Sequence, residues 1–390
     1  MKQIYLDNNA STRVAPEVSE AMLPFLGATA ANASSLHRSG QRARHAVEAA
    51  REKLAAFVGA LPEEIFFTSG GTEANNLAVK GLARAGMKKG NAHLVVSAIE
   101  HPSVLQASGQ CDKEWGTERS FVPADESGRV SAGSFREALR ADTALACLLL
   151  VNNETGVIQP APEISREAHQ RGALFHMDAC QALGKLSVDL RELRCATASF
   201  SAHKLYGPQG VGALFIRKGT SLEALFHGGH QEKNIRPGTE NVAGIVGFGA
   251  AVDFAAKHRE KHSREIARLS RMLYQKLVRE PGAVRRNGDE RFAVPNTLNL
   301  SFDGVDGPAL MMNLDLAGVA VSTGSACTAG SVEPSHVLIG MGLPPERARG
   351  ALRISLGAFT TEEEVLTAHE RIAKSVNRLR GERVSTGKAR

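Results

Sequence analysis

The chain lacks both the long uncharged apolar run of a membrane-spanning helix and the paired cysteines of a disulfide-rich or zinc-binding protein. Its longest uncharged apolar stretch covers residues 242–252, well short of the ~20 residues that cross a bilayer. The first nine residues contain no apolar core of a signal peptide. Five cysteines, at positions 111, 147, 180, 195 and 327, form no C-x-x-C pair, so reduced thiols are expected. We therefore expect a soluble, cytoplasmic protein that does not use a membrane.

Nucleotide-binding signatures are also missing. Residues 65–68 are apolar and typical of a strand, a Ser-Gly-Gly-Thr turn follows at 69–72, and a helical pattern begins after it. The turn has neither the lysine of a P-loop nor the spacing Gly-x-Gly-x-x-Gly. The backbone at Gly71 and the hydroxyl of Thr72 can still hold an anion at a helix N-terminus. Such a turn is often only a turn, but it can also serve as a phosphate cradle.

The chain carries a small excess of positive charge, most of it near the C-terminus. The formal net charge is +6, and the basic residues concentrate in the last segment, 374–390. Cations near the C-terminus of a helix interact favourably with the helix dipole. We therefore interpret this segment as the solvated end of a helix. The charge suits an anionic cofactor, and we expect no direct binding of nucleic acid.

Lys204, Asp178 and Ser201 supply the three groups that hold pyridoxal phosphate. This cofactor needs an amine for a Schiff base, a carboxylate that keeps its ring nitrogen protonated, and donors for its phosphate. Lys204 ends the sequence Ser-Ala-His-Lys, and Asp178 lies a short way upstream. A lysine in this setting is by itself more often a solvated loop residue. Together with the turn at Gly71 and Thr72, the three groups predict a pyridoxal phosphate site.

Strand-like apolar runs alternate with helical patterns through the first two thirds of the chain. This alternation predicts an α/β fold with a mostly parallel sheet and helices on both faces. Thr72, Asn153 and Asp178 fall at the carboxyl ends of these runs, where open α/β sheets bind ligands. The strands are expected at residues 65–68, 93–98, 144–151, 174–178, 196–200 and 211–217.

A second, smaller α+β domain is expected after the sheet. From Ala250 the sequence reads as a long charged helix, and strands follow at 297–300 and 352–355. We place a large domain at residues 14–257, and a small domain at residues 1–13 and 258–390.

A series of motifs follows in order along nearly the whole chain. They occupy residues 5–12, 67–76, 100–102, 151–160, 201–212, 236–241, 325–327 and 353–357. In kind and order these motifs resemble those of the cysteine desulfurases of the NifS/IscS type, which are class V aminotransferases. The resemblance implies the pyridoxal phosphate fold type I, a homodimer, and L-cysteine as substrate.

The resemblance also implies a role for each matching residue. Lys204 would form the Schiff base, Asp178 would pair with the pyridine nitrogen, and His101 would stack on the ring. The planar guanidinium of Arg353 would bind the substrate carboxylate. Thr239 would reach the phosphate from the second subunit. The remaining implied contacts are those of Gln181 and Asn153 with the phenolic oxygen and the substrate, of Gly71, Thr72, Ser201 and His203 with the phosphate, and of Asn32 with the substrate.

Cys327 separates the possible reactions, because sulfur transfer needs a thiol and transamination does not. It lies in a small, polar segment, whereas Cys147 lies among apolar residues and Cys180 follows the Asp178 strand, as structural cysteines do. We expect sulfur from L-cysteine to pass to Cys327 as a persulfide, L-alanine to leave, and His101 to be a candidate acceptor of the thiol proton. A selenocysteine lyase, an aminotransferase, and an RNA-binding module without turnover are the alternatives.

The sequence departs from the family pattern in three places, and each departure affects a different expectation. Ala33 stands where a proline is usual, so the backbone that presents Asn32 is less restrained. His230 stands where a glycine is common, and its side chain could crowd the loop or require a changed backbone angle. The chain also ends soon after its last helix. The sulfur acceptor, an iron–sulfur scaffold or a tRNA-thiolation enzyme, is therefore left open.

Overall fold

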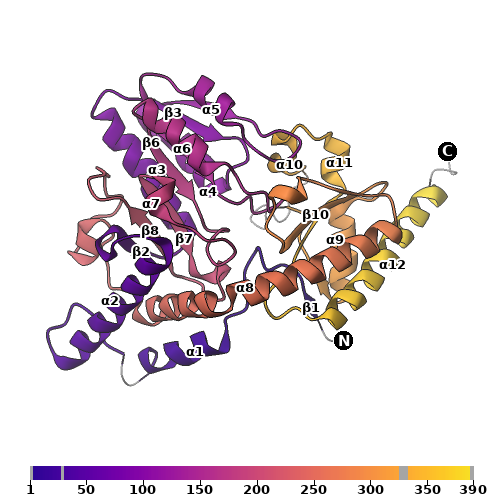
Figure 1. Ribbon diagram of the computed structural model, residues 1–390, viewed down its shortest axis with the longest axis horizontal. Helices are drawn as coiled ribbons and strands as arrows, with labels where there is room; N and C mark the ends of the chain where they lie inside the picture. Colours follow the sequence, from indigo (N-terminus) through magenta and orange to yellow (C-terminus); the bar gives the residue numbers. More distant parts are fainter. Residues whose placement is uncertain (1–2, 28–29, 325–332, 387–390) are drawn as a thin grey trace.

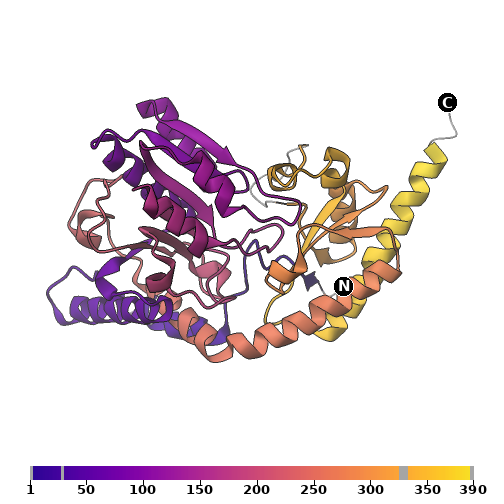
Figure 2. The same ribbon diagram turned by 45° about the horizontal axis from the view of Figure 1, so that its top comes forward.

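The computed structural model describes residues 3–27, 30–324 and 333–386. Two groups of strands and helices lie side by side, and one long helix, α8 (Val242–Arg279), runs along both of them (Figure 1, Figure 2). At 38 residues α8 is the longest helix described. Within the described part of the chain, neither α8 nor any other helix has the combination of length and apolarity needed to span a membrane.

A seven-stranded sheet forms the centre of the first group, with the strand order β2-β8-β7-β6-β5-β3-β4. β8 is antiparallel to both of its neighbours, and the other six strands run in one direction. The mostly parallel sheet expected from the sequence is confirmed. Its strands are β2 (Ile65–Thr68), β3 (His93–Ser97), β4 (Glu118–Val122), β5 (Thr143–Leu149), β6 (Leu174–Asp178), β7 (Thr197–Ser201) and β8 (Gly212–Ile216).

Helices cover both faces of this sheet, as its continuous apolar strands require. On one face, Leu82 of α3 and Val104 of α4 share a hydrophobic cluster with Leu145. On the other face, Leu54 of α2 shares a second cluster with Phe175 and with residues of α5, α6 and the start of α8. The helices of this group are α1 (Pro16–Met22), α2 (Arg38–Val58), α3 (Gly71–Met87), α4 (Pro102–Trp115), α5 (Ala132–Ala138), α6 (Ala161–Gln170) and α7 (Leu190–Leu193).

The second group has its own hydrophobic cluster, which Ile4 and Leu6 from the start of the chain join. α8 contributes residues up to Ala255 to the first group and residues from Ile266 onward to the second. The domain boundary expected after residue 257 falls inside this continuous helix, and the division into domains stays a prediction. The strands here are β1 (Ile4–Tyr5), β9 (Val284–Arg286), β10 (Thr297–Phe302), β11 (Val319–Ala320) and β12 (Ala351–Ser355), and the helices are α9 (Gly307–Leu316), α10 (His336–Gly340), α11 (Pro345–Arg349) and α12 (Glu362–Thr386).

Two small sheets complete this second group. β12, β10 and β9 form an antiparallel sheet in that order. β1 pairs in parallel with β11, so the first residues of the chain lie among elements formed by its last hundred. This pairing brings residues 7–12 toward the first group.

Candidate active site

A cavity of about 190 Å³ opens where β5, β6 and β7 end. The last residues of these strands, Leu149, Asp178 and Ser201, lie in its wall. Because the carboxyl ends of parallel strands meet at one edge of the sheet, the topology gathers these side chains. Ten residues expected from the sequence line this cavity: Gly71, Thr72, His101, Asn153, Asp178, Gln181, Ser201, His203, Lys204 and Arg353.

Asp178 is fixed as a hydrogen-bond acceptor in the cavity wall. Its Oδ2 accepts from Nδ2 of Asn75 at 2.7 Å, and its Oδ1 accepts from the N–H of Cys180 at 2.9 Å. Asn75 is in turn fixed by His176, whose Nε2 lies 3.1 Å from the Asn75 Oδ1. Burial lowers the pKa of His176 to about 4, so this ring is neutral near pH 7. A carboxylate held in this way can accept a hydrogen bond from a protonated ring nitrogen.

The start of α3 and the end of β7 form an anion cradle. A Cβ at Gly71 would come within 2.5 Å of the Cys180 sulfur, so any larger residue there would displace the Cys180 side chain. Thr72 follows in the first helical turn, where backbone N–H groups have no partner inside the helix. The Oγ of Ser201 is buried and has no hydrogen-bond partner among the described residues. Burial lowers the pKa of the neighbouring His203 to about 4. An anion with several oxygens, such as a phosphate, would satisfy this set of donors.

Lys204 ends the short 3-10 turn η3 (Ala202–Lys204), directly after β7. Its Nζ donates to the backbone carbonyls of Asn9 and Ala10 at 2.5 and 2.8 Å. These neutral acceptors come from the N-terminal segment. They hold the amine at the edge of the cavity.

Arg353 reaches the cavity from β12 and is only 1% exposed. One terminal nitrogen lies 2.8 Å from Oδ1 of Asp7, and the other donates to the carbonyl of Asn153 at 3.2 Å. Its Nε has no hydrogen-bond partner in the part of the chain that the structure describes. The guanidinium therefore keeps one donor that the described residues do not use, while Asp7 balances its charge.

His101 and Gln181 border the same space. His101 caps the start of α4, and its Nδ1 accepts from the N–H of Ser103 at 3.2 Å. The Nε2 of Gln181 donates to the carbonyl of Asn9 at 2.9 Å, and its Oε1 accepts from Nζ of Lys185 at 2.5 Å. Neighbouring residues therefore orient both side chains, and two of these neighbours, Ser103 and Asn9, also line the cavity.

Asn9 and Lys185 are site residues that the sequence reasoning did not single out. The Nδ2 of Asn9 donates to Oγ1 of Thr297 at 2.8 Å and to the carbonyl of Asn153 at 3.1 Å. Its Oδ1 accepts from Nζ of Lys185 at 2.8 Å. The presence of Asn9 in the motif at residues 5–12 was the available signal, but nothing local in that motif shows that Asn9 connects the two groups of strands.

Cys180 corrects one interpretation made from the sequence. We expected a structural thiol among apolar neighbours, as Cys147 is. Cys180 instead lines the cavity beside Gly71, because the chain turns back after β6 and the Cys180 N–H bonds to Asp178. Burial and the charge of Asp178 raise the pKa of the Cys180 thiol well above its ordinary value. This thiol is therefore protonated near neutral pH.

Three expected site residues are not placed in this cavity. Asn32 is exposed and does not line it. Thr239 is also exposed, in a loop whose Arg236 pairs with Glu73 of α3 at 2.8 Å. Cys327 lies outside the described residues.

The described residues on either side of Cys327 meet at Glu154, which is 1% exposed. Ser335 donates its hydroxyl to Oε2 of Glu154. Gly324 lies against the same carboxylate, since a Cβ there would be 3.2 Å from Oε2. Glu154 directly follows Asn153 of the cavity wall. Both flanks of the segment that contains Cys327 therefore lie next to the cavity.

The loop around His230 corrects a second expectation. His230 has an ordinary backbone angle, φ −90°, and its Nδ1 lies 2.8 Å from Oδ1 of Asn234. The positive φ angles fall instead on the three residues Glu232, Lys233 and Asn234, at 44°, 54° and 65°. The histidine therefore does not change the backbone angle at its own position. Ala33, the other departure considered, is buried.

Comparisons with known proteins agree with this fold and this cavity. The family model of aminotransferase class V matches residues 4–367, and the chain therefore belongs to the class V aminotransferase family. The family resemblance and the fold type expected from the motifs are confirmed. Enzymes of this family generally depend on pyridoxal phosphate.

One curated protein and two solved structures are similar to this chain over most of its length. The curated cysteine desulfurase IscS of Dictyoglomus turgidum is 43% identical over 379 residues, which are 97% of this chain and 96% of that protein. The solved structure of a NifS-like protein has a TM-score of 0.90 at 36% identity, covering 96% of this chain and 99% of that chain. A structure of SspA in complex with cysteine has a TM-score of 0.81 at 36% identity, covering 92% and 99%.

Proposed function

We propose that this protein is a pyridoxal phosphate-dependent cysteine desulfurase that converts L-cysteine to L-alanine and keeps the sulfur as a persulfide on Cys327. The observation that supports it most is the meeting of Lys204, Asp178 and the phosphate cradle in one cavity. Identity of 43% to a curated cysteine desulfurase over 97% of the chain supports the choice of substrate. A solved relative at 36% identity is a complex with cysteine.

The cavity suits the cofactor in size and in donors. About 190 Å³ is room for roughly fifteen water-sized groups at ~10–15 Å³ each, close to the size of a phosphorylated pyridine. Ser201 offers its unpartnered hydroxyl to the phosphate, and Asp178 accepts from the ring nitrogen. When bound, the cofactor supplies a ring that takes up the electron pair released at the substrate α carbon.

The residues of the chain then move protons and sulfur. Arg353 and Asn153 bind the substrate carboxylate, and Lys204 removes the α proton. His101 accepts the thiol proton of Cys327, whose thiolate attacks the substrate sulfur. The new S–S bond forms as the C–S bond breaks, and the electron pair stays on carbon, which is protonated to give alanine.

We further propose a homodimer in which Thr239 of one chain donates to the phosphate bound by the other. Its exposure and its absence from the cavity of its own chain support this arrangement. The persulfide then passes to an iron–sulfur scaffold or to a tRNA-thiolation enzyme. A cytoplasmic location stays a prediction.

Two variants test the reaction. Lys204→Ala is expected to fold and to form no alanine from cysteine. Cys327→Ser is expected to bind the cofactor with unchanged affinity, but to form no persulfide and release little alanine. Alkylation after a single turnover, followed by peptide mapping, locates the transferred sulfur.

The same experiment ranks the alternatives. An aminotransferase does not need a thiol, so undiminished turnover by Cys327→Ser would favour it and overturn the desulfurase. Sulfur mapped to Cys180, the other thiol at the cavity, would overturn the assignment of Cys327. A selenocysteine lyase would turn over selenocysteine much faster than cysteine.

A further inference from the structure

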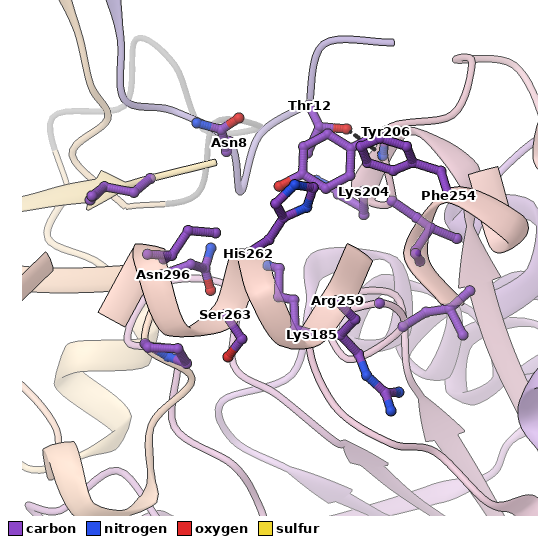
Figure 3. A pocket seen from close by; sticks show the side chains of 17 residues that line it. Asn8, Thr12, Lys185, Lys204, Tyr206, Phe254, Arg259, His262, Ser263 and Asn296 are labelled. Atoms are coloured by element: carbon purple, nitrogen blue, oxygen red, sulfur yellow. Dashed lines mark hydrogen bonds between the residues drawn. The ribbon is translucent and has the colours of Figure 1, made fainter. Parts of the chain in front are cut away.

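A second cavity, of about 50 Å³, shares Lys204 with the cofactor cavity (Figure 3). It lies where the N-terminal segment, the turn after Gln181 and α8 meet, and these three parts contribute Asn8, Lys185 and His262 to its wall. Its volume is room for roughly four water-sized groups. Apart from Lys204, none of the residues assigned to the cofactor or the substrate lines it.

The wall of this second cavity is cationic. Among the described residues that line it, four can bear positive charge, namely Lys185, Lys204, Arg259 and His262, and none is an aspartate or a glutamate. Arg259 contributes its stem, because its guanidinium donates to the carbonyl of Leu186 at 3.1 Å. Figure 3 shows this guanidinium directed away from His262 and Tyr206. The positive charge that faces the cavity therefore comes mainly from the two lysines.

Lys185 is a partly buried amine whose hydrogen-bond partners are both neutral. Its Nζ donates to Oδ1 of Asn9 and to Oε1 of Gln181, which uses two of the three N–H groups of an ammonium. Burial, followed by the charges of Lys204 and Arg353, lowers the pKa of Lys185 well below its ordinary value. A buried charge is costly unless an opposite charge accompanies it. An anion in the adjoining cavity would supply that charge.

Further donors around the cavity are not used by the protein. The hydroxyl of Tyr206 accepts from the N–H of Ala358 at 2.8 Å, so its own hydrogen is available to another acceptor. Within the described ranges, the side chains of His262 and Ser263 form no hydrogen bond. Burial lowers the pKa of His262, as do His258 and Lys261, which favours the neutral ring with a single N–H.

We propose that this cavity binds a small carboxylate, of about four non-hydrogen atoms and without an amino group, on the ammonium of Lys185. Two carboxylate oxygens let one ligand accept from Lys185 and from a second donor such as Tyr206, His262 or Ser263. An amino group on the ligand would be repelled by the lysines. Because Lys185 holds Asn9 and Gln181, and Asn9 holds Lys204, the ligand and the cofactor influence each other's affinity reciprocally.

Calorimetric titration of the holoenzyme with acetate tests the site. We expect saturable 1:1 binding of acetate and no binding of acetamide, its neutral isostere. Acetate affinity should fall as the pH is raised, because the ligand pairs with the protonated lysine and Lys185, flanked by Lys204 and Arg353, gives up its proton. Cofactor absorbance should change with the same acetate midpoint as the heat.

Two variants and a control complete the test. Lys185→Met is expected to weaken acetate binding at least about tenfold, whereas Lys257→Met, on the exposed side of α8, keeps wild-type affinity. Because Lys185→Met also removes bonds to Asn9 and Gln181, Ser263→Leu provides a second variant that fills the cavity and retains the lysine, and it should also lose acetate binding.

The proposal is overturned if the wild-type holoenzyme gives no saturable heat with acetate, if acetamide binds equally well, or if both variants bind acetate like the wild type. None of these measurements involves cysteine or Cys327. Their outcome is therefore independent of the desulfurase assignment.

Discussion

Ser201 provides a residue-scale test of the phosphate cradle. Buried hydroxyls nearly always have a partner, and that of Ser201 has none among the described residues. We expect Ser201→Ala to weaken pyridoxal phosphate binding by roughly ten- to a hundredfold, as the loss of a hydrogen bond to a charged group does. The stability of the cofactor-free protein should change little. Absorbance titration of the apoprotein measures the affinity.

Ser199 offers a matched control two residues earlier in β7. Its hydroxyl is also buried and also lacks a partner in the described part of the chain, but Ser199 does not line the cavity. Ser199→Ala should keep wild-type cofactor affinity. An equal loss in both variants would show that the strand, and not the Ser201 hydroxyl, is responsible.

Some residues of the candidate site could be predicted from their chemical type, and others could not. Lys204, Asp178 and Ser201, which line one cavity, could be proposed from the sequence because pyridoxal phosphate requires an amine, a carboxylate and a donor. Asn9 could not be, since its role arises from contacts with Lys204 and Thr297, far along the chain. The orientation of such a connecting side chain is set by tertiary packing, which leaves no local pattern.

At the scale of elements, the short 3-10 turn η4 (Gln231–Asn234) is anchored by one buried ion pair. Glu232 accepts from Arg51 at 2.7 and 2.9 Å and from the N–H of Phe67 at 2.8 Å. Its side chain is 3% exposed and that of Arg51 is 11% exposed. Glu232→Ala should lower the free energy of unfolding by roughly 3–5 kcal/mol, because it leaves a buried guanidinium with less compensation. Urea unfolding followed by circular dichroism measures this change.

Glu48 provides the control for Glu232, because both carboxylates pair with Arg51 but only Glu232 is buried. It contacts the same guanidinium at 3.1 Å, but its side chain is 51% exposed. Glu48→Ala should cost about 0.5 kcal/mol or less, as exposed pairs do. Similar losses for the two variants would contradict the anchoring role of Glu232.

The sequence predicted the positions of elements better than their directions. Each expected strand begins within one residue of an observed one, because short apolar runs between turn residues are a strong local signal. The antiparallel direction of β8 was not expected, since direction depends on the partner strands. α8 begins at Val242, eight residues before the expected Ala250. The helix tolerates glycine in this first part because Gly249 allows close packing on α2, where a Cβ would lie 2.9 Å from that of Ala50.

At the scale of the whole molecule, the proposed dimer makes cofactor retention depend on protein concentration. Thr239→Ala should weaken pyridoxal phosphate binding about tenfold without changing the sedimentation coefficient. Thr220→Ala, in a turn away from the cavity, serves as the control. Dilution that dissociates the dimer should also release cofactor. Sedimentation velocity with detection at the cofactor absorbance follows both effects, and a monomer with full cofactor occupancy would refute a shared site.

Residues 4–12 join parts of the molecule that the ribosome produces far apart in time. Ile4 pairs with Val319, the N–H of Asn8 bonds to the carbonyl of Ser355, and Asn9 holds Lys204. At ~5–20 residues per second, synthesis of the roughly 350 residues from the first to the last of these takes about 20–70 s. β1 has not yet met its partner strand β11 during that time. Because β1 is only two residues long, it exposes few unpaired backbone groups to which other nascent chains could bind. The surroundings of Lys204 are therefore incomplete until Ser355 has been made, and we expect the proposed cofactor to bind only after the chain leaves the ribosome.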